Sequence, residues 1–83
     1  MSEWTDRLAE TLGVAPIDRD QEDSILKTSR EIAHRVERKD TPLTTYLIGV
    51  SVGTATTSGT NPAAALGIAL DAVLAALPPD PGP

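Results

Sequence analysis

The residues best suited to chemistry lie close together in the middle of the chain. His34 is the only histidine, and Arg38 follows it at a spacing that places both side chains on one face of a helix. Thr41, Thr44 and Thr45 add hydroxyl groups where the next apolar segment begins. Cationic side chains beside the free amide groups of a helix start can hold a phosphate or a carboxylate. The candidate binding residues for a small anion or a nucleotide are therefore these five.

A solvated basic surface is the simpler interpretation of the same residues. Helical angles place His34 and Arg38 with Lys27 and Arg30, on the side opposite the apolar residues of the same segment. Neighbouring acids balance this charge, and positive charge near a helix C-terminus is favourable. The sequence leaves both interpretations open. Under either one, His34 is expected to be exposed.

Neither a metal centre nor a catalytic centre is predicted. A single histidine, with no cysteine and no convergent cluster of acids, does not supply three metal ligands from one place. Glu31 and Glu37 flank His34 in sequence, but their spacing does not set them beside it together with a nucleophile. We therefore expect a domain that has no enzymatic activity and needs no cofactor.

Length and composition indicate one small domain. A chain of 83 residues forms a core that is only marginally stable alone, which favours a protein partner or a homodimer. We expect the helical domain to span residues 1–77 and the proline-rich tail 78–83 to be disordered.

The absence of cysteine and of an export signal predicts a cytoplasmic protein. A net charge of −5 argues against binding to nucleic acid or to an anionic membrane.

Charge is distributed unevenly along the chain. Residues 1–23 carry seven acids against two bases, whereas residues 24–40 carry five bases against three acids. Residues 41–70 carry no charge, but their continuous apolar run is shorter than the roughly twenty residues that a membrane span needs. This half is expected to form the core. A bundle so small can hardly bury two uncharged helices on every side, so the remaining surface is a candidate contact face.

Apolar spacing predicts an all-α, compact four-helix bundle without strands, with helices near 3–12, 20–38, 42–54 and 62–77. In the first helix, Trp4, Leu8 and Leu12 form one stripe, which needs a partner to pack against. Ser2 is the predicted N-cap, and Gly13 is expected to end the helix in a left-handed conformation. In the second and longest helix, which Asp18 or Asp20 caps, one face contains Ile25, Leu26, Ser29, Ile32, Ala33 and Val36.

The third helix is predicted against the β propensity of its threonine, valine and isoleucine residues. Thr41 and Pro42 form an N-cap and N1 pair, and the apolar stripe that follows consists of Leu43, Tyr46, Leu47 and Val50. Ile48 and Val52 lie on the other side, so this helix is apolar nearly all round and is expected to be central. Trp4 and Tyr46, the only aromatic residues, are predicted to lie in the core.

Small residues are expected to bring the last two helices together. Gly49 and Gly53 lie four residues apart on one face and would let another helix approach closely. Asn61 and Pro62 repeat the cap-and-proline signal at the start of the fourth helix. That helix carries a leucine and valine stripe beside a small-residue stripe of Ala65, Ala69, Ala72 and Ala76. We therefore predict that the two glycines pack against these alanines.

The central segment also resembles a known family. Matching residues are the early tryptophan, "LG" after the first helix, "AH", a basic residue, "PLTTYL" and two glycines four apart: Trp4, Leu12, Gly13, Ala33, His34, Arg38, Pro42, Leu43, Thr44, Thr45, Tyr46, Leu47, Gly49 and Gly53. The family is a group of small bacterial domains of unknown function, found alone or fused behind a molybdenum-cofactor guanylyltransferase. The sequence departs from its pattern at Arg35, where a small residue is expected, and at the "KDT" before the proline.

The resemblance implies the biological process in which the domain acts rather than a reaction that it catalyses. Fusion to a guanylyltransferase implies an accessory or docking module in molybdenum-cofactor biosynthesis, with a nucleotidyltransferase as its partner. The leading hypothesis is accordingly a non-catalytic helical interaction module that self-associates or docks through its uncharged face. The other is an anion-binding or nucleotide-binding domain at His34, Arg38 and the start of the third helix.

Overall fold

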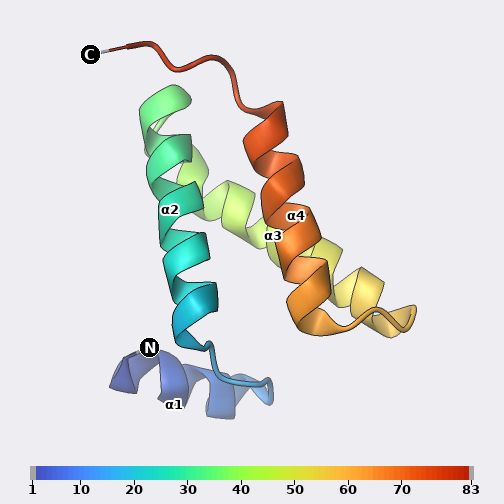
Figure 1. The fold of residues 1–83 in the computed structure, drawn as a ribbon. Coiled ribbons are helices and arrows are strands. Elements are labelled where there is room, and N and C mark those ends of the chain that lie inside the picture. The colour runs from blue at the N-terminus through green and yellow to red at the C-terminus, as the bar shows by residue number, and fades with distance from the viewer. Residues whose placement is uncertain (1, 83) are drawn as a thin grey trace.

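A computed structural model describes residues 2–82, which contain four α-helices joined by short connections (Figure 1). Their bounds are Glu3–Leu12 for α1, Arg19–Arg35 for α2, Asp40–Thr57 for α3 and Pro62–Ala76 for α4. Residues 2–82 contain no strand. The predicted all-α fold with four helices is therefore confirmed, and so is the helical state of α3 in spite of its β-branched residues.

The predicted ends of α1 are confirmed. The amide of Thr5 donates to the side-chain oxygen of Ser2 at 3.0 Å, and the amide of Ser2 donates back to the Thr5 hydroxyl at the same distance. Gly13 has a φ of 70°, the left-handed conformation that a side chain would oppose. Local sequence signals thus define this helix at both ends.

The caps of α2 and α4 also follow the predicted pattern. The carboxylate of Asp18 accepts a hydrogen bond of 2.8 Å from the amide of Gln21, and α2 begins at the next residue after Asp18. At α4 the side chain of Asn61 accepts from the amides of Ala63 and Ala64, and Pro62 occupies the first turn. Both caps satisfy donors that have no partner within the helix.

The connection between α2 and α3 differs from the prediction. Helix α2 ends at Arg35 rather than near residue 38, and α3 begins at Asp40 rather than after Thr41. Lys39 occupies the N-cap position with helical backbone angles, and its side chain makes no capping bond. The amides of Asp40 and Thr41 instead donate 3.1 Å bonds to backbone carbonyls of the preceding turn. The turn thus runs directly into α3, which places Thr41 inside the first turn rather than at the N-cap, so the predicted hydroxyl cap by Thr41 is wrong.

The core lies where α2, α3 and α4 meet. Its buried centre is formed by Ile48, Ala69 and Leu70, around which Ile25, Val52, Leu66 and Val73 pack. Figure 1 shows α3 crossing behind α2 and α4. Helix α1 lies across the end of the molecule at which α2 begins, and it packs against none of the other three helices along its length.

Two apolar stripes that were expected in the core are exposed. On α3, Ile48 and Val52 face the core, so the opposite stripe that contains Tyr46 faces solvent, and Tyr46 is 71% exposed. On α1, Trp4 is 64% and Leu12 is 65% exposed. The prediction that both aromatic residues are core residues is therefore wrong. Helix α3 has apolar residues on two opposite faces, and only one of them can be turned inward.

None of the helices within residues 2–82 combines the length and the hydrophobicity that a membrane span requires.

Candidate functional site

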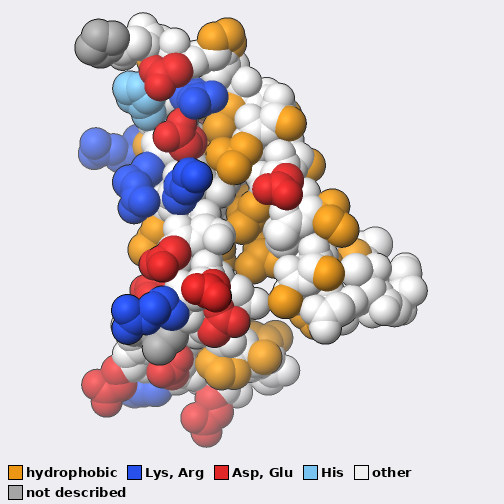
Figure 2. Space-filling view, in the orientation of Figure 1, with side chains coloured by type: hydrophobic (Ala, Val, Ile, Leu, Met, Phe, Trp, Pro, Cys, Tyr) orange, Lys and Arg blue, Asp and Glu red, His pale blue; other side chains and the backbone are white. Residues whose placement is uncertain are grey.

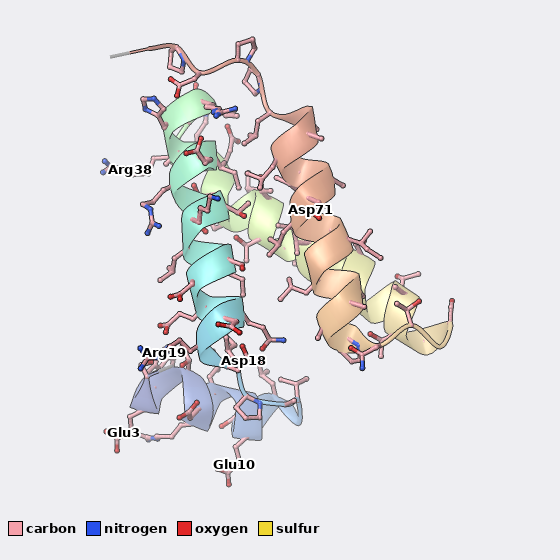
Figure 3. All side chains as sticks on the ribbon, viewed as in Figure 1. Glu3, Glu10, Asp18, Arg19, Arg38 and Asp71 are labelled. Carbon is pink, nitrogen blue, oxygen red and sulfur yellow. The ribbon has the colours of Figure 1, made fainter. Side chains whose placement is uncertain are left out.

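The predicted basic site lies where α2 ends and the turn to α3 begins. His34 is exposed, as predicted, and Arg38 lies in the turn with its side chain pointing away from the helices (Figure 3). Figure 2 shows the charged side chains gathered over α1 and α2, while hydrophobic side chains occupy the space between α2 and α4. His34 and Arg38 thus lie at the edge of a charged surface.

The three threonines of the predicted site do not offer free hydroxyl groups together beside His34 and Arg38: Thr41 and Thr44 are half-buried, and only Thr45 is exposed. The hydroxyl of Thr41 is enclosed and has no hydrogen-bond partner among the described residues. The hydroxyl of Thr45 donates 2.8 Å to the carbonyl of Thr41, and Thr44 is half-buried. Asp40 adds a negative charge to the first turn of α3, which opposes an incoming anion. Anion binding here stays a prediction, for which the structure gives little positive support.

The basic residues are also paired with acids of the same chain. Arg35 and Glu31, one turn apart on α2, form a 2.8 Å ion pair, and Lys39 lies 3.4 Å from Glu37. These pairs partly neutralise the end of α2. They favour the solvated basic surface over a charged pocket.

The tail contributes a contact that the sequence did not predict. A carboxylate oxygen of Asp80 lies 3.0 Å from Nε2 of His34, so the segment after α4 crosses the end of α2. The backbone amide of Gly82, which donates to the same oxygen at 2.8 Å, and the imidazole of His34 together lower the pKa of Asp80 below its usual range. Residues 77–82 contain no helix or strand, yet this contact places them on the surface of α2.

An apolar groove opens between α2, α3 and α4. It has a volume of about 640 Å³, within the range of pockets that bind small molecules or side chains of a partner. The lining from α2 and α4 includes Ile25, Ile32, Leu66 and Leu70, and residues 14–17 close one end. No charged residue lines it, although a few hydroxyl and amide groups do. Hydrophobic side chains between α2 and α4 mark its position in Figure 2.

Gly49 and Gly53 form part of the groove wall. A Cβ atom added at either residue would meet no atom of another part of the chain within 4 Å. The predicted packing of these glycines against the alanines of α4 is therefore wrong. Helix α4 is held instead by contacts with the Ile48 and Val52 side of α3, and the glycine face stays open as part of the groove.

A second apolar surface lies on the other side of α3. We call it the α3 outer face, and it consists of Leu43, Tyr46, Leu47 and Val50, which are between 48% and 71% exposed. Their spacing puts all four on one side of the helix, away from Ile48. The three packed helices leave both this surface and the groove open.

Comparison with known proteins assigns the chain to a family. The family model described as a domain of unknown function, DUF6457, matches residues 1–79. The chain belongs to the DUF6457 family. No curated protein and no solved structure matches it. The sequence resemblance to a domain of unknown function is thereby confirmed, and the match covers all four helices.

Sequence reasoning missed three features of this DUF6457 domain. The groove was missed because the glycine pair was interpreted as a helix contact. Asp80 was missed because no local pattern connects it to His34, 46 residues earlier. The α3 outer face was found as a stripe but was assigned to the core. Its signal was the excess of apolar positions around α3, which a chain of this length cannot bury on every side.

Proposed function

We propose that this DUF6457 domain is a non-catalytic interaction module that docks on a protein partner through the α3 outer face. The observation that carries the proposal is the exposure of four large apolar residues in one row, Leu43, Tyr46, Leu47 and Val50. Contiguous exposed apolar patches on small proteins commonly mark interaction sites. A tyrosine flanked by leucines is also typical of the residues that dominate binding energy at interface centres, because it buries a large area and keeps a polar tip.

The composition of the rest of α3 supports the same proposal. No charged residue occurs between Thr41 and Leu70, so a partner would not have to desolvate a charge in order to cover this face.

We propose further that the partner is a nucleotidyltransferase of molybdenum-cofactor biosynthesis. Support for this step comes from the resemblance to domains that occur alone or fused behind a molybdenum-cofactor guanylyltransferase. In a fused protein the two domains are held together by the chain, whereas a free domain needs a surface that recognises the enzyme. The α3 outer face would supply that surface.

The experiment mixes the purified domain with the molybdenum-cofactor guanylyltransferase of the same organism and measures complex formation by sedimentation velocity and calorimetry. We expect a defined complex that Leu47→Glu weakens at least about tenfold, or about 1.4 kcal/mol. Ala75→Glu is the matched control, because Ala75 is exposed on α4, outside the α3 outer face. Absence of a complex would exclude this partner, and a complex that is indifferent to Leu47→Glu would exclude this face.

A further inference from the structure

Helix α1 carries an apolar stripe that its own chain covers only in part. The stripe consists of Trp4, Leu8 and Leu12, of which Trp4 and Leu12 are about two-thirds exposed and Leu8 is 37% exposed. Helical angles put the charged residues of α1 on the opposite side, and Glu3 and Glu10 point away from the other helices in Figure 3. Burial of such a stripe is the usual source of stability for a short helix, which is marginal when alone. In the single chain the burial of this stripe is incomplete.

The groove matches the missing partner in length. Its α2 wall runs from Gln21 to Ile32 and its α3 wall from Thr45 to Thr56, and each run rises by about 16 Å in helical geometry. Helix α1, from Glu3 to Leu12, is about 15 Å long by the same measure. The walls of the groove are therefore as long as one α1 helix.

The surfaces also match in shape and charge. Gly49 and Gly53 leave the groove wall without side chains, so a helix with large residues can lie close to α3. The groove has no charged lining, and the stripe of α1 has no charge. The charged side of α1 would remain in water after docking.

The loop after α1 keeps this helix out of its own groove. The amide of Gly13 donates to the carbonyl of Glu10 at 3.1 Å, and the amide of Val14 donates to that of Ala9 at 2.9 Å, which fixes the direction of the chain as it leaves α1. Residues 14–17 then occupy one end of the groove. The chain therefore carries α1 across the end of the groove rather than into it, and a second molecule can offer its α1 without disturbing this loop.

The surface area of the chain agrees with an uncovered interface. The accessible surface is 6082 Å², about 1,300 Å² more than the 4,700 Å² or so that a compact monomer of this mass exposes. A stable interface of standard size buries about 800 Å² on each partner. The excess accessible surface of the chain is sufficient for one interface of this size.

We propose that two copies of this domain form a dimer in which α1 of each copy fills the groove of the other. The interface is reciprocal, because each chain supplies one helix and one groove, as a closed two-fold dimer requires. The α3 outer face lies on the opposite side of α3 from Ile48 and takes no part in it. This inference is independent of the proposed function.

Trp4 reports directly on this interface because it is the only tryptophan. The experiment follows its fluorescence and the sedimentation mass of the wild-type protein over a dilution series. We expect a dimer with blue-shifted emission at high concentration, and a halving of mass that coincides with a red shift on dilution. A blue-shifted monomer would mean that α1 occupies its own groove, and a red-shifted dimer would mean another interface. Either of these, or a monomer at every concentration, overturns the proposal.

Two substitutions test the two halves of the interface separately. Gly49→Leu fills the groove, where an added side chain starts in open space, and Leu8→Glu places a charge in the α1 stripe. Each is expected to weaken the dimer at least about tenfold while circular dichroism shows an unchanged helix content. Gly67→Leu is the matched control, because Gly67 is exposed on α4 outside the groove, and Leu47→Glu is the control for the α3 outer face. If Gly49→Leu and Leu8→Glu both dimerise as tightly as the wild type, the proposal is overturned.

Discussion

At the scale of single residues, the two glycines of α3 show how one pattern permits opposite structures. A pair of glycines four residues apart suits a tight helix contact, but it suits equally a wall that must leave room for something else. In this structure Gly49 and Gly53 border the open groove. Their sequence spacing identifies the face correctly and does not identify what covers it.

The open environment of Gly49 leads to a prediction about stability. Gly49→Ala should raise the free energy of unfolding of the monomer by about 0.5–1 kcal/mol, because alanine loses less backbone entropy in a helix and the added methyl group meets no atom within 4 Å. Urea unfolding at low protein concentration measures the change. Gly67→Ala, on the exposed side of α4, is the control and should give a similar gain. A loss of stability at Gly49 alone would show that the groove is filled in the monomer.

At the scale of helices, the sequence predicts which segments are helical but not how each is turned. Ser2, Asp18 and Asn61 mark helix starts through hydrogen bonds that depend only on local sequence, and all three caps are present. The orientation of α3 could not be predicted in this way, because apolar residues surround the helix and no face is distinctly polar. Its start was misplaced for another reason: backbone bonds of Asp40 and Thr41 to the preceding turn let the helix begin before the Thr41 and Pro42 signal.

The isolation of α1 predicts that its cap matters only locally. Ser2→Ala removes a capping bond worth about 1 kcal/mol and should raise amide exchange throughout α1. Because α1 packs against none of the other helices in the monomer, the unfolding midpoint of α2, α3 and α4 should not change. Asp18→Ala removes the equivalent bond from α2, which belongs to the core, and should lower the stability of the whole domain by about 1 kcal/mol.

Amide exchange measured by NMR at low concentration, together with thermal melts of both variants, distinguishes the two cases. Equal loss of global stability for Ser2→Ala and Asp18→Ala would show that α1 is coupled to the core in the monomer. The groove of the same chain would then be its most direct docking place, and the dimer proposal would fail with it.

At the scale of the whole molecule, uneven hydrophobicity explains why so much apolar surface is left outside. The apolar positions of α3 and α4 exceed what the three packed helices α2, α3 and α4 can bury. Helix α1, which could have covered the groove, lies across its end instead. The accessible surface of 6082 Å² implies that the chain buries about a fifth less area on folding than a compact protein of the same mass. Partner binding is the physical means by which such a chain gains the missing stability.

The small buried area predicts a low heat-capacity change of unfolding for the monomer. A compact domain of 83 residues has a change of about 1 kcal/mol/K, and a fifth less buried area lowers the expected value to about 0.8 kcal/mol/K. Circular dichroism melts at several urea concentrations measure it at micromolar protein, with Leu8→Glu as a reference that cannot offer an apolar α1. The heat-capacity change of the wild type should match that of Leu8→Glu in dilute solution. It should rise with protein concentration, because unfolding of a dimer also exposes the apolar surface that two grooves and two α1 helices bury against each other. A wild-type value near 1 kcal/mol/K at the lowest concentration would mean that a single chain already buries its α1 stripe.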